Sequence, residues 1–207
     1  MNCASRGMEV SLRGRTSHAA HPEDGKSPAL AMCELVRDLT NLEIQSESNC
    51  YRGVTVVHAQ LGEAAFGTSP GDARVLATLR TERDDDMARL VESAIALSES
   101  TAARSGLAHT IRFEDVFDAT TNSAAGTKLV ERAADEVGLA VRPLDVPLRW
   151  SEDFGVLIEA SGGGALIAIG SGVEQPQLHA PDYDFPDELI PHGVSLFEKI
   201  VRTALNQ

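Results

Sequence analysis

The alternation of apolar and polar residues predicts a small sheet in the first half of the chain. Residues 8–12 read MEVSL, the two-residue period of a strand with one buried face. The same period over residues 54–61 and 73–79 predicts two more strands, and Ile111 and Phe113 mark a fourth. Glycine and proline between residues 62 and 72 predict a turn region between the second and third strands.

Two helices are predicted between these strands. Ser27 followed by Pro28 is typical of a helix start, and Leu30, Cys33 and Val36 then form an apolar stripe. A second helical stripe runs through Met87, Leu90, Ala94, Leu97 and Thr101. The order βαββαβ predicts a ferredoxin-like α+β domain over residues 1–115, with both helices on one face of a four-stranded sheet. Strand parity places Arg80 and His58 on the other face.

The second half of the chain, residues 116–207, predicts the order αβαβα. One helix begins at about Ser123 and ends at Gly138, and another follows a possible capping residue, Ser151. Short strands are predicted near Val141 and over residues 165–169, and a final apolar helix covers residues 190–204. A sheet of two strands is too small to bury the apolar faces of three amphipathic helices, and small domains bury a smaller proportion of their surface. We therefore expect an incomplete α/β segment with much exposed apolar surface.

Composition narrows the class of protein. The chain has 207 residues, 43% hydrophobic and 24% charged, which favours one or two folded domains. A net charge of −13 argues against a nucleic-acid partner. No apolar run approaches the length of a membrane span, and the start MNCASRG lacks a signal-peptide core. The three cysteines show no CxxC spacing, which favours a reduced, cytoplasmic setting.

Four motifs follow one another along the chain. Residues 14–20 read GRTSHAA, followed by Pro22 and Gly25, and residues 66–71 read FGTSPG, followed by TLR at 78–80. Residues 151–154 read SEDF, and residues 178–185 read LHAPDYDF. In this order and over nearly the whole chain, the motifs resemble the C-terminal half to two-thirds of the dinuclear-zinc amidohydrolases of metallopeptidase family twenty. That family includes aminoacylases, carboxypeptidases and desuccinylases.

The resemblance implies a fold, a reaction and partners. Residues 1–115 would be the lid or dimerisation domain, which forms a homodimer, and residues 116–207 the last segment of a zinc-exopeptidase-like catalytic domain. The expected reaction is hydrolysis of an amide bond in an N-acyl amino acid or a small dipeptide-like substrate. In complete relatives two zinc ions polarise a water and the scissile carbonyl, and a glutamate takes the proton of the water.

Three residues match functional positions of the family. The resemblance implies that His179 is a zinc ligand and that Arg80 binds a substrate carboxylate. It also implies that His18 reaches into the active site of a neighbouring subunit and donates an N–H to the oxyanion. Without the resemblance, each residue has a simpler interpretation: a surface-loop histidine, a solvated strand arginine and a turn histidine. His18 and His21 could also form a local metal pair, although Pro22 disfavours a helix at His21.

The sequence also departs from the family pattern. Relatives carry a preceding stretch of similar length with an H-x-D ligand pair, a bridging carboxylate and the general base, so we expect these 207 residues to be inactive alone. The chain is then a truncation, one half of a split enzyme, or a non-catalytic lid-derived module for dimerisation or ligand binding.

A second departure lies in the lid. Many relatives have a substrate-contacting asparagine just before the proline of the second motif, where this chain has Phe66, Gly67 and Thr68. Glu152 and Asp153 resemble paired catalytic acids but also suit a helix start, and Trp150 is either core or pocket wall.

Overall fold

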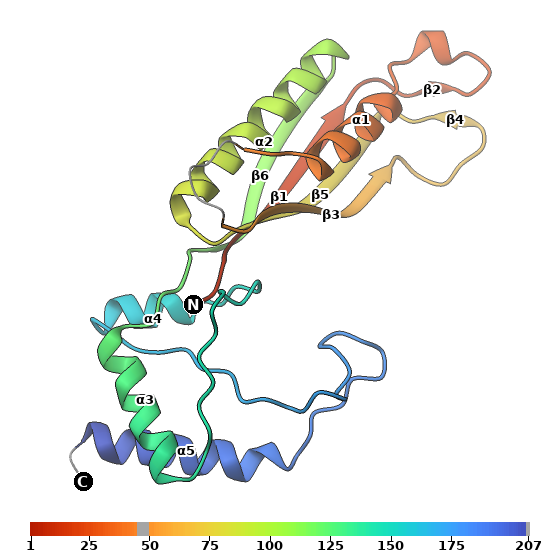
Figure 1. Cartoon of the computed structure of the whole chain (residues 1–207). Helices are drawn as coiled ribbons and strands as arrows, with labels where there is room; N and C mark the ends of the chain where they lie inside the picture. Colours follow the sequence, from red (N-terminus) through yellow and green to blue (C-terminus); the bar gives the residue numbers. More distant parts are fainter. Residues whose placement is uncertain (45–49, 206–207) are drawn as a thin grey trace. The chain divides into compact units, whose positions relative to one another are not determined.

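The computed structural model describes residues 1–44 and 50–205 and divides into two compact units. The first, here called the sheet unit, comprises residues 2–120 and 147–153. The second, the helical unit, comprises residues 121–146 and 154–207 together with Met1. Figure 1 shows the course of the chain through both units. The assignment of a lid to residues 1–115 and of a catalytic segment to residues 116–207 stays a prediction.

The sheet unit has the predicted ferredoxin-like topology. Its long strands are β1 (Ala4–Arg13), β3 (Arg52–Leu61), β5 (Asp72–Thr81) and β6 (Ala108–Phe117), with the order β3-β5-β1-β6 and antiparallel pairing throughout. Helix α1 (Ala29–Thr40) connects β1 to β3, and α2 (Asp84–Arg104) connects β5 to β6. The α+β fold class predicted from the sequence is therefore confirmed.

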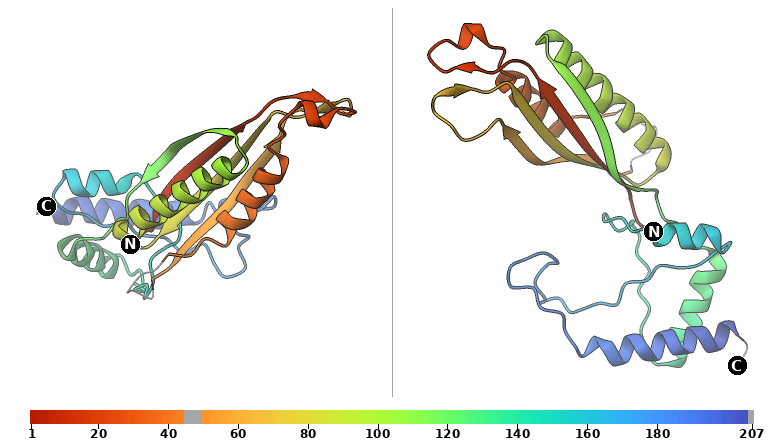
Figure 2. Two further views of the ribbon diagram at one scale, coloured as in Figure 1. Left: turned by 90° about the horizontal axis from the view of Figure 1, so that it is seen from above. Right: turned by 180° about the vertical axis from the view of Figure 1, so that it is seen from behind.

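One face of this sheet carries the hydrophobic core. The core side chains of β1 and β5 mostly alternate with partly buried or exposed ones, and α1 and α2 cover the core face (Figure 2). Fully buried members include Val10, Leu12, Val75 and Leu79 on the strands and Leu35, Leu39 and Leu90 on the helices. Because burying one such side chain contributes about 1.5–3 kcal/mol, this cluster is the main source of stability in the unit.

The core-facing side of α1 differs in part from the prediction, since Val36 packs against the core but the other two members of the predicted stripe do not. The buried residues are Ala31, Leu35 and Leu39, whereas Leu30 is 80% exposed and Cys33 is also exposed. Both stripes have helical spacing, so the pattern alone did not decide which side meets the sheet. In α2, by contrast, Met87, Leu90, Ala94 and Thr101 are buried as predicted.

The outer face of the sheet carries polar residues. Arg80 lies between Gly53 of β3 and Ser5 of β1 in the strand register. His58 pairs with Leu76, which shares the face of Arg80, so the predicted common face of Arg80 and His58 is confirmed. The neighbouring residue Val57 is 60% exposed, because β3 has an irregularity between Val56 and His58.

The helical unit contains α3 (Ala124–Glu136), α4 (Phe154–Ala160) and α5 (Leu189–Ala204). Ser123 caps α3 by accepting a hydrogen bond from the Gly126 N–H, as the predicted helix start implied. Helices α3 and α5 pack together around the buried residues Ala133, Ala134 and Leu196. No helix in the described part of the chain is long and apolar enough to cross a membrane.

The two strands predicted for the second half are not formed. Residues 141 and 165–169 lie outside any strand, and the described part of the helical unit contains none. A strand needs a neighbouring backbone to bond with. Here the Leu166 N–H donates to Asn122 Oδ1 and the Asn122 amide donates to the Leu166 carbonyl, both at 2.9 Å. A side chain therefore satisfies the backbone that the sequence predicted to join a sheet.

Much of the apolar surface of the helical unit is exposed, as expected from its composition. Helix α5 buries Leu196 against α3 but exposes a second apolar stripe, and α4 exposes two further side chains. On α4 and α5, the large apolar side chains that are more than half exposed are Val156, Leu157, Ile190, Val194, Phe197 and Val201. The unit therefore leaves unburied a large share of the apolar area that normally stabilises a domain.

Candidate active site

A short two-stranded ribbon beyond the end of β1 carries His18 (Figure 1). Strand β2 (Ser17–His18) pairs with β4 (Thr68–Ser69), and His18 lies opposite Thr68. The ribbon is closed by backbone contacts, including a hydrogen bond of 2.7 Å from the Gly14 N–H to the Gly71 carbonyl. A Cβ atom on Gly71 would lie 2.4 Å from the Thr16 nitrogen, so this close approach requires glycine.

The imidazole of His18 is exposed and oriented by its own turn. Its Nδ1 accepts a hydrogen bond of 3.0 Å from the backbone N–H of Ala20. A backbone amide only donates, so in this arrangement Nδ1 carries no proton and the ring hydrogen is on Nε2. In this arrangement the ribbon presents an imidazole whose Nε2–H is a hydrogen-bond donor.

His21 lies beside His18 but has a different local role. It precedes the short helix η1 (Pro22–Asp24) with a φ of −132°, so the expected non-helical backbone at His21 is confirmed. Its Nδ1 lies 3.3 Å from Glu23 Oε1. The ring centroids of His18 and His21 are 6.4 Å apart, within the range at which rings interact.

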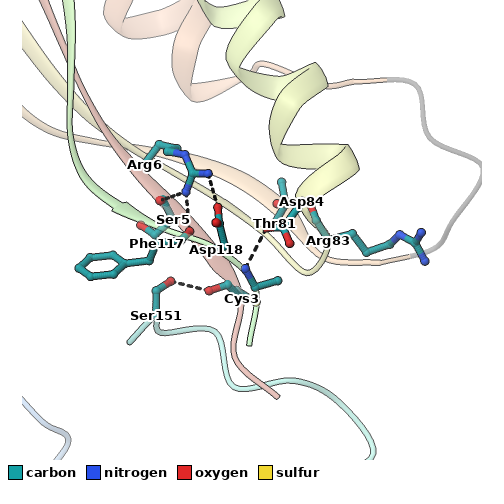
Figure 3. A network of polar contacts seen from close by, with 10 residues as sticks. Cys3, Ser5, Arg6, Thr81, Arg83, Asp84, Phe117, Asp118 and Ser151 are labelled. Carbon is teal, nitrogen blue, oxygen red and sulfur yellow. Dashed lines mark hydrogen bonds and ion pairs between the residues drawn. The ribbon is translucent and has the colours of Figure 1, made fainter. Parts of the chain in front are cut away.

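Arg80 is held by a segment that returns from far along the chain. Its Nη1 donates to the Arg149 carbonyl at 3.0 Å and to Ser151 Oγ at 3.2 Å. Ser151 Oγ in turn donates to the Cys3 carbonyl at 2.7 Å (Figure 3), and the Cys3 N–H donates to the Leu148 carbonyl at 3.0 Å. Arg80 is therefore a half-buried, anchored side chain and not a freely solvated one.

These contacts also correct the role expected for Ser151. Helix α4 begins at Phe154, and the Ser151 hydroxyl binds Cys3 and Arg80 instead of capping that helix. Glu152 and Asp153 belong to the same returning segment, which is part of the sheet unit. Their roles stay unassigned.

A second polar network fixes the neighbouring strand ends (Figure 3). Arg6 donates from Nη1 to the Phe117 carbonyl and from Nη2 to Asp118 Oδ1, both at 2.5 Å. The Ala119 N–H donates to Asp84 Oδ1 at 2.8 Å. The first turn of α2 is therefore not merely solvated, because Asp84 binds backbone and Asp86 is fully buried and paired with Arg89.

His179 occupies a strained turn in the helical unit. The Ala180 N–H donates to the Gln177 carbonyl at 2.9 Å, which makes His179 the third residue of a β-turn. Its φ is +72°, and the only other described non-glycine residue with a positive φ is Asp115. Such backbones cost about 1–3 kcal/mol and cluster at functional sites. The ring is exposed, and no strand precedes His179 in the described part of the helical unit.

His18 and Arg80 lie at opposite ends of the sheet unit. Arg80 pairs with Ser5 near the start of β1, whereas the ribbon follows Arg13, the last residue of β1. The eight residue steps from Ser5 to Arg13 span about 26 Å at about 3.3 Å each. Within one chain the two side chains therefore cannot contact one small substrate. Among the described residues, no three His, Cys, Asp or Glu side chains are grouped so that they could hold a metal ion.

Solved structures share this fold. A tripeptidase from Staphylococcus aureus superposes with a TM-score of 0.72 over 100% of this chain and 53% of its own, at 16% identity. The aminopeptidase PepT from Bacillus cereus superposes with a TM-score of 0.70 over 96% of this chain and 51% of its own, also at 16% identity. An aminobenzoyl-glutamate utilization protein from Klebsiella pneumoniae superposes with a TM-score of 0.65 over 78% of this chain and 42% of its own, at 23% identity.

Curated sequences and a family model match as well. An uncharacterized hydrolase of Staphylococcus epidermidis is 21% identical over 196 residues, which are 92% of this chain and 51% of the relative. One from Staphylococcus aureus is 22% identical over 195 residues, with the same coverage. The chain therefore spans about half the length of these relatives. The model described as Peptidase family M20/M25/M40 matches residues 18–203, which confirms the resemblance seen in the four motifs. The chain belongs to peptidase family M20/M25/M40.

Proposed function

We propose that this chain is the lid and the last catalytic segment of a metal-dependent amidohydrolase that cleaves an amide bond in an N-acyl amino acid or small peptide-like substrate. Family membership supports a hydrolase, since the curated relatives are named hydrolases. Two structural neighbours are named a tripeptidase and an aminopeptidase, names that both describe amide-bond cleavage. The observation that carries the proposal is the oriented Nε2–H of His18 on the ribbon.

His18 would stabilise the oxyanion of the tetrahedral intermediate. Attack on an amide carbonyl places negative charge on its oxygen, and a fixed donor lowers the energy of that state. The Ala20 N–H orients the His18 ring in advance, so little reorganisation is needed. Because Arg80 of the same chain lies at the far end of the sheet, His18 would serve the active site of the second subunit in a homodimer.

Arg80 would bind the carboxylate of the substrate. Its Nη1 is occupied by Arg149 and Ser151, whereas Nε and Nη2 make no hydrogen bond within residues 1–44 and 50–205. That leaves one edge of a fixed guanidinium for a carboxylate, which arginine binds in a bidentate manner.

His179 would be a zinc ligand in the complete enzyme. Zinc sites use three or four protein donors, and the residues described here offer one imidazole in a strained turn but no group of three donors. They fit one ligand and not a complete centre, so we assign no chemical step to a metal. The remaining ligands and the general base would be supplied by another segment or chain.

The second candidate is a non-catalytic module for dimerisation or ligand binding. The sheet unit favours it, because that unit has its own core and complete strand order. The sequence encoded upstream of Met1 separates the possibilities. An in-frame H-x-D segment supports the enzyme, a separate adjacent frame supports a split enzyme, and neither favours the module.

The direct test is hydrolysis of N-acyl amino acids and dipeptides by the protein from that complete reading frame, with zinc added. We expect turnover in the complete protein and none in the 207-residue chain. His21→Ala is the matched control for His18→Ala, since both rings are exposed and His21 follows the ribbon closely in the sequence. Absence of turnover with every N-acyl amino acid and dipeptide in the complete protein would refute the proposed function.

A further inference from the structure

Arg80 and Arg149 are among the arginines of the sheet unit that lack a carboxylate partner, although the chain has a net charge of −13. Neither Arg80 nor Arg149 forms an ion pair with any residue that the structure describes. Arg149 instead stacks on an aromatic ring, with its Cζ 4.2 Å from the centroid of Tyr51. In an acidic protein, two arginines without an acidic partner on one surface suggest an anionic ligand.

The strand register places both groups on the same face of the sheet. Gly53 lies directly across from Arg80, and residues two apart on a strand share a face. A Cβ atom on Gly53 would lie 2.9 Å from the Tyr51 hydroxyl, so the Tyr51 side chain extends over Gly53. Arg149 therefore stacks on a ring that lies beside Arg80, and no side chain of Gly53 separates them.

The thiol of Cys3 gives an independent indication that the two charges converge. Burial raises the pKa of Cys3, and the Glu82 carboxylate raises it further, while Arg80 and Arg149 both act to lower it. Both guanidinium groups thus lie close enough to act on the same sulfur atom. Glu82 is held nearby by a hydrogen bond of 2.9 Å from the Tyr51 N–H to its Oε1.

Both arginines are also held in place before any ligand arrives. Arg80 is fixed through Nη1 by the Arg149 carbonyl and Ser151 Oγ, and Arg149 is fixed by Tyr51. Ligand binding then costs little side-chain entropy. Arg80, Arg149 and Glu82 together carry a net charge of +1, which suits a single carboxylate better than a dianion.

We propose that Arg149 acts with Arg80 as a binding residue for the free carboxylate of an N-acyl amino acid or peptide, and that Tyr51 positions Arg149. This inference rests on the proposed function for the identity of the ligand. It adds Arg149 and Tyr51 to a site for which the sequence indicated only Arg80. The alternative is that the two arginines only fasten residues 147–151 to the sheet.

The test measures binding, so it needs no activity. Trp150 is the single tryptophan of the chain and directly follows Arg149, so its fluorescence can report on the site. The intact 207-residue chain is titrated with N-acetyl-leucine, with the neutral analogue N-acetyl-leucinamide, and with inorganic phosphate, and calorimetry confirms each Kd. We expect saturable binding of the carboxylate and at least about tenfold weaker binding of the amide, as for loss of a charged hydrogen bond. Phosphate should also bind more weakly than the carboxylate.

Variants then separate the two arginines. Arg149→Gln and Arg80→Gln should each raise the Kd about tenfold, whereas the exposed control Arg142→Gln should leave it unchanged. Tyr51→Phe keeps the ring and should bind like wild type, while Tyr51→Ala should bind more weakly. This tyrosine pair decides the question if Arg149→Gln fails to fold.

Each contrary result has its own meaning. Wild-type affinity in Arg149→Gln, with weakened binding in Arg80→Gln, would overturn the inference and leave the proposed function intact. Equal affinity for the acid and the amide, tighter binding of phosphate, or no saturable binding at all would also overturn the inference. Failure of the complete protein to hydrolyse amides would instead refute the proposed function, whatever the binding result.

Discussion

The backbone N–H of Ala20 donates a hydrogen bond of 3.0 Å to Nδ1 of His18. Because of this contact, the backbone of the turn after β2 selects the tautomer of His18 that carries its hydrogen on Nε2. Backbone geometry, which substitutions of neighbouring side chains change little, therefore sets the chemistry of His18. It follows that His18 should be sensitive to replacement of its own ring and insensitive to loss of the ring of His21.

The first prediction concerns His18→Ala in the complete enzyme. We expect the rate to fall by about 10²–10³, the usual effect of removing one oxyanion donor, with unchanged metal content. Rate measurements and metal analysis of the purified variant check both points, and His21→Ala should keep most of the activity. Loss of metal in His18→Ala would contradict the assignment.

The same variant tests whether His18 acts across a dimer. His18→Ala mixed with a second variant disabled at His179 should regain part of the activity, because the mixed dimer holds one intact site. Mixtures of each variant with itself are the controls. If mixing restores no activity although mixed dimers form, His18 does not act in the partner subunit.

The second prediction concerns assembly. We expect the intact chain to form a concentration-dependent homodimer in sedimentation experiments, because β3 and β6 are open edges of the sheet. Val57 on β3 and Val116 on β6 are similarly exposed, at 60% and 56%, so Val57→Lys and Val116→Lys form a matched pair. If the dimer forms through one of these edge strands, the lysine substitution on that strand should weaken dimerisation, and the substitution on the other strand should not. A strict monomer at high micromolar concentration would contradict the prediction.

The third prediction concerns the stability of the second half. Residues 116–207 expressed alone should bind a hydrophobic dye and exchange amide protons rapidly, because α5 exposes a whole apolar stripe. Dye fluorescence and hydrogen exchange measure both properties, with residues 1–207 as the reference. A cooperative unfolding transition without dye binding would show that this segment is a complete domain.

The fourth prediction concerns acid. The hydrogen bond from Arg74, at 2.6 Å, is the main reason that the pKa of Glu9 is lower than usual. A lowered folded-state pKa stabilises the fold above the unfolded-state pKa of about 4.3, and this stabilisation is lost as pH falls through the folded-state value. Glu9→Gln should therefore flatten the loss of unfolding free energy below about pH 4.3. Because the pair is partly exposed, the effect should be small.

Chemical denaturation at a series of pH values measures this effect. Glu92→Gln, on the exposed side of α2, is the control and should keep the wild-type slope. An unchanged acid slope in Glu9→Gln would show that the contact with Arg74 adds nothing to stability.

The sequence predicted the sheet unit well because its strands alternate strictly, as in Val10, Leu12, Val75 and Leu79. The sequence-based prediction failed where two different structures are compatible with the same spacing of apolar residues. Leu30 and Ala31 both begin a helical stripe, and only packing against the sheet decides between them. Residues 165–169 have the composition of a strand, but strand formation depends on a neighbouring backbone that a local pattern does not reveal.

The candidate site was predicted only in part, for a related reason. His18, Arg80 and His179 were found through motifs, which are local in sequence. The contact between Arg149 and Tyr51 joins residues almost one hundred positions apart, and no motif links them. An arginine beside the SEDF motif was the only available signal, and many surface arginines have similar surroundings.

The sheet unit is assembled from two separate stretches of sequence, since residues 147–153 join it after the chain has left at residue 120. A gene fragment that ends at residue 115 or 120 therefore omits the backbone that binds Cys3 and Arg80. Any attempt to transplant this unit into another protein must bridge residues 120 and 147 with a new linker. Recombination at a single crossover point cannot transfer the sheet unit intact. The two halves of the chain must therefore be inherited together for the unit to be preserved.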